Sequence, residues 1–231
     1  MSEGDSAWPR AVLFDLDGTL IDSAPAIAGA LNAIRRGRGG EDLAVHIVRP
    51  WISLEAATMV ELGLGPLALD RQADLRAFRE VYGARRSTLE DFYDGAVEVL
   101  TELSERGLLL GLCTNKPQHL TEKILADCGL TDRFAAIVGG RPGEPAKPHP
   151  EPVRLCLSRM GVSPGDAAFV GDSETDAEAA MRAGVPFLLV TYGYPMGDLA
   201  DIIRAAESNA PRDIPHALSR LSPQMTVTAS C

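Results

Sequence analysis

Short apolar runs without polar interruption alternate with longer stretches of helical periodicity along much of the chain. Each run is four to six residues long and ends at a glycine or at polar residues. Because apolar residues fill consecutive positions, both faces of such a strand should be buried, as in a parallel sheet. The runs are residues 11–14, 108–113, 135–138, 167–170 and 187–190.

The stretches between most of these runs have the spacing and the end signals of helices. In residues 95–106, Val97, Leu100 and Leu103 recur at helical spacing, and Gly107 follows as a C-cap. Similar segments at 117–128, 151–160 and 174–183 are each followed by a glycine. The alternation predicts the α/β class, with a Rossmann-like, doubly wound parallel-sheet core and right-handed crossovers.

Residues 24–92 differ from the rest, because helical periodicity in 24–36, 53–62 and 70–86 is separated by no convincing strand. We therefore expect a small all-helical cap inserted after the first strand. The predicted domains are a discontinuous core, 1–22 and 93–231, and a cap, 23–92. The basic residues Arg35, Arg36 and Arg38 are interpreted as a solvated helix end. The tail from Glu207 onward is too weakly patterned to assign.

Composition and charge narrow the class of partner. The chain has 231 residues, with 22 Lys and Arg against 32 Asp and Glu, and its net charge of −10 argues against nucleic acid and anionic membranes. No apolar run approaches the ~18–20 residues that span a bilayer. Residues 1–10 lack the apolar stretch of a signal peptide, and the four cysteines, Cys231 among them, form no C-x-x-C pair. We expect a cytoplasmic monomer or homodimer.

Polar residues cluster where the first four predicted strands end. Since open parallel sheets bind ligands beyond the carboxyl ends of their strands, these clusters should converge on one crevice. Four carboxylates in a small crevice repel one another, and Mg²⁺ with substrate phosphate oxygens relieves that repulsion. A lysine, a hydroxyl and an amide suit the remaining anionic oxygens. The residues concerned are Asp15, Asp17, Asp172, Asp176, Thr114, Asn115 and Lys147.

The pair Asp15 and Asp17 at the first strand end suits phosphoryl transfer. An aspartate can act as a nucleophile that forms an aspartyl-phosphate. A second acid two residues later can protonate the leaving oxygen and then activate water, and Gly18 permits the turn that brings Asp17 back. The residues therefore point to chemistry on a phosphoryl group.

Four motifs in the chain resemble those of the haloacid dehalogenase superfamily, in the expected order. They are Asp15-Leu16-Asp17-Gly18-Thr19-Leu20, Thr114-Asn115-Lys116, Lys147-Pro148-His149-Pro150 and Gly171-Asp172-Ser173-Glu174-Thr175-Asp176. Thr114 and Lys147 are 33 residues apart, and Lys147 and Asp172 are 25 apart, each close to one βαβ unit. Within the superfamily the chain is similar to the phosphoglycolate phosphatase group.

The resemblance implies a role for each residue. Asp15 would be the nucleophile and a metal ligand, and Asp17 the general acid and base, with its main-chain carbonyl on the metal. Asp172 would bind Mg²⁺, with Asp176 in or next to that shell. Lys147 would bridge the phosphate and the nucleophile. Thr114 and Asn115 would hold phosphate oxygens. The implied reaction is conversion of 2-phosphoglycolate, a small phosphorylated metabolite, to glycolate and phosphate.

Other interpretations stay open from the sequence. The same scaffold could serve a phosphosugar mutase, a pyrophosphatase or a sugar-phosphate phosphatase. A phospho-accepting signalling receiver also combines acids, Thr, Lys and Mg²⁺, although it lacks an acid at the position of Asp17 and a helical cap. A dehalogenase needs neither Asp17 nor a metal. Thr114 and Asn115 could also serve only as an N-cap for the helix that follows.

Overall fold

A computed structural model describes residues 9–195 and 197–221 of the chain. The predictions for the N-terminal segment before residue 9 and for Cys231 lie outside the described residues. The chain divides into two compact units. The first contains the residues up to Ile21 and those from Thr88 onward, and the second is Asp22–Ser87.

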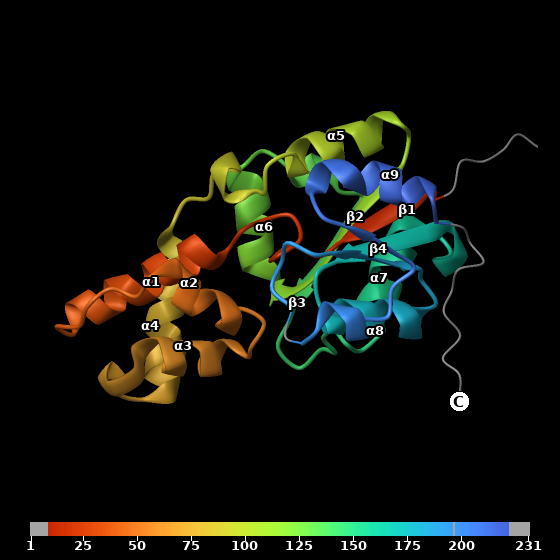
Figure 1. The fold of residues 1–231 in the computed structure, drawn as a ribbon. Helices are drawn as coiled ribbons and strands as arrows, with labels where there is room; N and C mark the ends of the chain where they lie inside the picture. The colour runs from red at the N-terminus through yellow and green to blue at the C-terminus, as the bar shows by residue number, and fades with distance from the viewer. Residues whose placement is uncertain (1–8, 196, 222–231) are drawn as a thin grey trace, which may run out of the picture. The chain divides into compact units, whose positions relative to one another are not determined.

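The first unit is built on a parallel six-stranded sheet with the order β3-β2-β1-β4-β5-β6 (Figure 1). From β1 the chain adds β2 and β3 on one side and then crosses to β4 on the other side. The sheet is doubly wound, as predicted, and its topological switch point lies at β1. The strands are β1 (Ala11–Phe14), β2 (Leu109–Pro117), β3 (Ala136–Gly140), β4 (Ala167–Gly171), β5 (Phe187–Val190) and β6 (Ala206–Ser208).

Helices cover both faces of this sheet, because alternate residues along its apolar strands point to opposite sides. One core contains Val12 and Phe14 with residues of α5, α6 and α9, and the other contains Ala11 and Leu13 with residues of α7 and α8. Figure 1 shows α5 and α9 on one side of the strands and α7 and α8 on the other. The helices are α5 (Ala96–Glu105), α6 (Gln118–Asp127), α7 (Glu151–Met160), α8 (Glu174–Ala183) and α9 (Ile214–Ser219).

The second unit, all of whose residues are described, contains helices and no strand, as expected for the insertion. Its core is a cluster of apolar residues that includes Leu31, Val48, Val60 and Phe78. At the start of its first helix the Asp22 carboxylate accepts a hydrogen bond from the Ala24 N–H, while the N-cap residue, Ser23, makes no side-chain capping bond. The helices are α1 (Ala24–Gly37), α2 (Val45–Val48), α3 (Ala56–Leu64) and α4 (Arg71–Ala84).

The interpretation of the basic cluster at the C-terminal end of α1 as a solvated helix end is wrong for Arg38. Its guanidinium lies 2.6 Å from Asp74, whose side chain is only 3% exposed. Arg35 also points inward and donates to the main-chain oxygen of Gly63. Arg36 is exposed, as expected. Arg35, Arg36 and Arg38 are close in sequence but have different environments, because α4 and the end of α3 pack against α1.

The tail that the sequence left unassigned supplies the sixth strand, β6, and α9. Strand β6 is three residues long and polar at Glu207 and Ser208, so it lacks the apolar run that marks the other strands. It pairs with β5 at the edge of the sheet, where burial is one-sided. In the part of the chain that the structure describes, none of the helices has the length and apolar character needed to cross a bilayer.

Candidate active site

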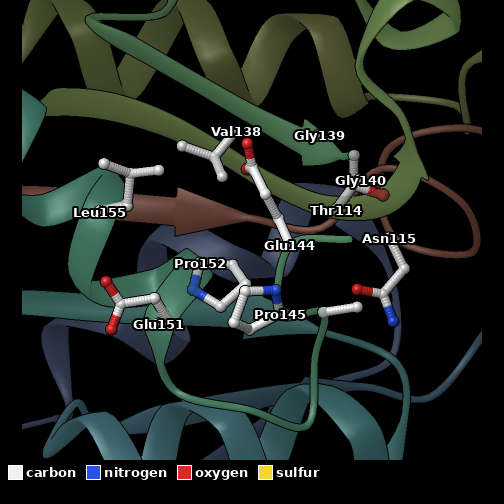
Figure 2. A pocket seen from close by; sticks show the side chains of 11 residues that line it. Thr114, Asn115, Val138, Gly139, Gly140, Glu144, Pro145, Glu151, Pro152 and Leu155 are labelled. Carbon is white, nitrogen blue, oxygen red and sulfur yellow. The ribbon is translucent and has the colours of Figure 1, made fainter. Parts of the chain in front are cut away.

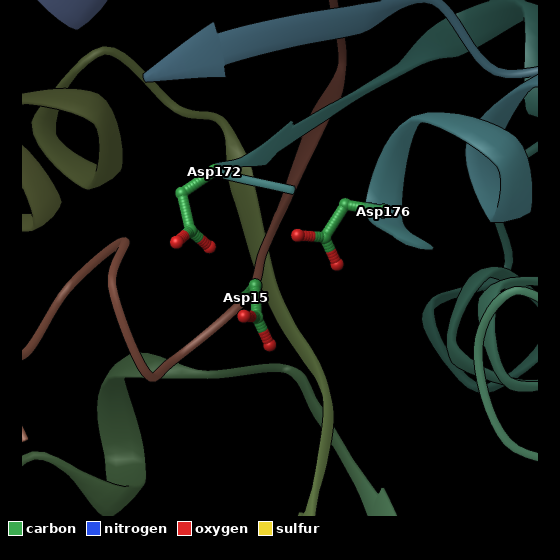
Figure 3. A group of neighbouring side chains, drawn as sticks. All are labelled: Asp15, Asp172 and Asp176. Atoms are coloured by element: carbon green, nitrogen blue, oxygen red, sulfur yellow. The ribbon is translucent and has the colours of Figure 1, made fainter. Parts of the chain in front are cut away.

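The strand ends bring three of the four predicted acids together beside β1. Asp15 directly follows β1, and its N–H donates to the Val170 oxygen of β4, so the chain is still part of the sheet at this residue. Asp172 directly follows β4, and Asp176 lies in the first turn of α8. One carboxylate oxygen from each of the three lies within 4.8 Å of the others (Figure 3). All three residues are buried.

Lys147 lies within this cluster, although it comes from the loop after β3. Its Nζ is 2.7 Å from Asp15 Oδ1, 2.6 Å from Asp176 Oδ1 and 2.9 Å from the main-chain oxygen of Cys113. The Nζ also lies 5.4 Å from the centre of the Phe169 ring. The side chain is 2% exposed. The three acids and the lysine therefore form one buried ionic group.

The pKa shifts of Asp15 and Asp172 indicate that the positive charge of Lys147 is too small to balance the negative charge of this group. Burial raises the pKa of Asp15 to about 6 against the opposing effect of Lys147, and the charge of Asp176 adds to the rise. Burial, followed by the charges of Asp176 and Asp15, raises the pKa of Asp172 well above its usual range. Burial favours the neutral form of Lys147, but the charges of Asp15 and Asp176 outweigh it and raise its pKa. One ammonium group does not neutralise three buried carboxylates.

Asp172 is fixed by main-chain and hydroxyl donors that the sequence did not single out. The Tyr194 N–H donates to Oδ2 at 2.6 Å, and the Thr19 hydroxyl donates to Oδ1 at 3.3 Å. Two glycines make room for this carboxylate. A Cβ at Gly18, which has a φ of +84°, or at Gly193 would collide with Asp172. The turn after Asp17 thus packs on the acid of the fourth motif.

Asp176 is oriented by the N-terminus of α8. Ser173 and Asp176 form a capping box, in which the Ser173 hydroxyl and N–H both donate to Asp176 Oδ2. Asp176 Oδ1 accepts from Lys147, so each of its oxygens already has a partner. Asp176 therefore fixes Lys147 as well as adding a carboxylate to the cluster.

Asp17 points to a different partner from Asp15. Its carboxylate lies 2.8 Å and 3.1 Å from the Nζ of Lys116, whose side chain is 6% exposed. Lys116 belongs to the motif Thr114-Asn115-Lys116, and no role was predicted for it. The signal was its place at the end of a strand, which extends to Pro117 rather than stopping at Cys113 as predicted.

The two predicted phosphate ligands lie at the carboxyl end of β2. Thr114 is buried, and its hydroxyl oxygen accepts from the Lys116 N–H at 3.3 Å. Asn115 has both side-chain polar atoms bonded to the main chain of Lys147. Both residues line a pocket of about 230 Å³ (Figure 2). The other lining residues are Val138, Gly139, Gly140, Glu144, Pro145, Ala146, Glu151, Pro152 and Leu155.

The acidic cluster fits a divalent cation. Its donors are carboxylate oxygens, the type that hard cations prefer, and they are buried at short mutual distances. The raised pKa values of Asp15 and Asp172 show that additional positive charge would stabilise their ionised forms. The donor set and its electrostatics are compatible with a cation site, and the cluster contains three of the four acids from which the sequence predicted one, since the Asp17 carboxylate pairs with Lys116 instead.

The doubly wound α/β core, with acids at its switch point, is typical of α/β enzymes that bind their ligand beyond the carboxyl ends of the strands. Comparison with known sequences gives the family. The sequence pattern described as haloacid dehalogenase-like hydrolase matches residues 12–190. The chain belongs to this family, and the predicted resemblance is confirmed.

Known relatives agree with this assignment. The phosphoglycolate phosphatase of Xanthomonas campestris pv. campestris (strain 8004) is 38% identical over 192 residues, which cover 83% of this chain and 87% of the relative. That of Xylella fastidiosa (strain 9a5c) is 35% identical over 216 residues and 93% of each chain. A crystal structure described as a predicted phosphoglycolate phosphatase from Haemophilus somnus 129pt has a TM-score of 0.77 and 26% identity, covering 92% of this chain and 99% of that chain. The protein is a phosphatase of this family.

Proposed function

We propose that the protein is a Mg²⁺-dependent phosphatase that hydrolyses 2-phosphoglycolate to glycolate and phosphate through an aspartyl-phosphate on Asp15. The observation that carries the proposal is the buried contact of Lys147 with Asp15 beside two further carboxylates. The likeness to phosphoglycolate phosphatases along most of their length supports the choice of substrate.

In this proposal Asp15 and Asp172 hold Mg²⁺, with Asp176 beside them and the main-chain carbonyl of Asp17 as a further ligand. When bound, Mg²⁺ supplies positive charge that offsets the carboxylates and the phosphate oxygens. Lys147 and Thr114 orient the phosphate for attack from the side of Asp15. All of these residues except Asp17 are buried, so water competes little for the same contacts.

The reaction then has two displacements. A carboxylate oxygen of Asp15 forms a bond to phosphorus while the bond to the glycolate oxygen breaks, and Asp17 gives its proton to that oxygen. Asp17 next takes a proton from water, the water oxygen bonds to phosphorus, and the bond to Asp15 breaks. Phosphate leaves and both aspartates return to their starting states. The helical unit, Asp22–Ser87, is the cap in this scheme and selects the substrate.

A panel of phosphomonoesters assayed by phosphate release with Mg²⁺ tests the proposal. We expect the highest kcat/KM for 2-phosphoglycolate. A higher value for a hexose phosphate or for pyrophosphate would overturn the substrate. Isomerisation of a sugar phosphate without phosphate release would indicate a mutase, and a long-lived aspartyl-phosphate without turnover would indicate a receiver.

A further inference from the structure

The side chain of Asn115 is engaged with another part of the chain rather than being free to point at a ligand. Its Nδ2 donates to the main-chain oxygen of Lys147 at 2.8 Å, and its Oδ1 accepts from the Lys147 N–H at 2.9 Å. The two residues are 32 positions apart, in β2 and in the loop after β3. One amide group therefore binds both polar groups of a single residue's main chain.

This contact fixes Lys147 at its main-chain end. At the other end of the residue, Nζ is bound by Asp15, Asp176 and the oxygen of Cys113. Cys113 and Asn115 belong to the same strand, so β2 binds Lys147 at both ends of its flexible four-carbon stem. Two parallel hydrogen bonds fix the position and the rotation of the Lys147 backbone, whereas one bond would leave it free to rotate.

We propose that Asn115 is a positioning residue that holds Lys147 against Asp15, and that its side chain acts on the reaction through Lys147 rather than as a phosphate ligand. The inference rests on the proposed function, in which Lys147 bridges the phosphate and the nucleophile. It changes the role expected for Asn115 from the sequence, where the motif placed it on the phosphate oxygens. Thr114, its neighbour, keeps the phosphate-binding role.

A double-mutant cycle distinguishes the two roles. The variants are Asn115→Ala, Lys147→Ala and the combination, assayed at saturating 2-phosphoglycolate. We expect Asn115→Ala to lower kcat by about 10- to 100-fold, the range for a misplaced catalytic group. In the Lys147→Ala background the same change should alter kcat less than about twofold. Effects that multiply in the combined variant would overturn the inference, because Asn115 would then act independently of Lys147.

The helical unit offers a matched control. Asn32 Nδ2 donates to the Leu43 oxygen at 2.9 Å, and the Leu43 N–H donates to Asn32 Oδ1 at 2.8 Å, so it makes the same pair of bonds. Asn32→Ala removes the same two bonds, but from a buried residue, whereas Asn115 is exposed. It should therefore lower the thermal midpoint at least as much as Asn115→Ala does, and it should leave kcat for a small generic substrate such as p-nitrophenyl phosphate unchanged. An equal loss of kcat in both variants would reduce the role of Asn115 to stability.

A measurement without turnover separates this inference from the proposed function. In the folded wild type Lys147 is buried and ion-paired, so an amine-reactive reagent should label it slowly. In Asn115→Ala we expect labelling at least about tenfold faster, read from the Lys147 peptide by mass spectrometry, with Asn32→Ala matching the wild type. Unchanged labelling would overturn the inference, even if Lys147→Ala had no measurable activity. A wild type that releases no phosphate from any monoester would overturn the proposed function and leave this readout intact.

Discussion

The protein buries a carboxylate with a cation in each of its two units, and the two sites differ in how well the charge is satisfied. In the helical unit, the Asp74 carboxylate accepts hydrogen bonds from Arg38 and from the Leu69 N–H, while the Asp74 N–H donates to the main-chain oxygen of Asp70. Burial alone would raise the pKa of Asp74, but the hydrogen bonds from Arg38 and Leu69 outweigh it and lower the pKa. The partners of this carboxylate therefore compensate fully for its burial.

In the sheet unit, by contrast, Asp15, Asp172 and Asp176 share one lysine. Burial raises the pKa of Asp15 to about 6 and that of Asp172 well above its usual range, although Lys147 lies in contact. A structural ion pair lowers the pKa of its acid, as at Asp74, whereas the pKa values of Asp15 and Asp172 stay raised because one lysine does not neutralise the three carboxylates. The Arg38–Asp74 pair is thus typical of a contact that stabilises the fold, and the sheet cluster is typical of a functional site that binds a further cation.

The largest expected effects come from isosteric substitutions of Asp15 in the sheet unit and of Asp74 in the helical unit. Asp15→Asn should lower kcat by at least about 10³-fold, because an amide cannot attack phosphorus, and should leave the thermal midpoint equal or higher. Asp74→Asn should do the reverse, lowering the free energy of unfolding by about 1–3 kcal/mol while keeping kcat. Steady-state assays and chemical denaturation measure both. Turnover retained by Asp15→Asn would remove the mechanism.

Removal of divalent metal should silence the enzyme. EDTA should reduce phosphate release to background, and added Mg²⁺ should restore it, since the acids of the cluster lack sufficient positive charge without it. Mg²⁺ should also raise the thermal midpoint of the wild type and of Asp74→Asn but not of Asp172→Asn. Activity indifferent to both EDTA and Mg²⁺ would contradict the cation site.

The stability of the metal-free protein should depend on pH through Asp15. Its folded pKa of about 6 exceeds the ordinary 3.8, so the folded state binds a proton more tightly than the unfolded chain. This contribution, about 3 kcal/mol, is complete below the ordinary value and is lost as pH rises through about 6. Denaturation in EDTA between pH 4 and pH 7 should show a decline that Asp15→Asn reduces. Asp74→Asn should leave the decline unchanged, because the lowered pKa of Asp74 places its titration below this window.

The smallest expected effect is at Lys116. Lys116→Met removes the contact that fixes the Asp17 carboxylate, and kcat should fall by about 3- to 10-fold with little change in KM. Lys123→Met, which breaks the Lys123–Asp127 pair on α6, is the control and should change neither. If both variants kept wild-type kcat, the contact with Lys116 would have no role in positioning Asp17 for the reaction.

Much of this arrangement could be predicted from the chain. Consecutive apolar residues located β1 to β5, and the parallel topology explains why acids 157 residues apart, Asp15 and Asp172, meet at one edge. What escaped prediction depends on packing between distant segments. Asn115 meets Lys147 only because β2 and the loop after β3 lie together, and Arg38 meets the buried Asp74 only because α4 packs on α1. Strand β6 escaped because an edge strand can be short and polar.

A crystal structure with Mg²⁺ and inorganic phosphate tests the central claim most directly. We predict a cation bound by carboxylate oxygens of Asp15 and Asp172, with phosphorus about 3–3.5 Å from an Asp15 oxygen and phosphate oxygens on Lys147 and Thr114. A cation bound elsewhere, or a phosphate outside the reach of Asp15 while Lys147 keeps its present partners, would contradict it.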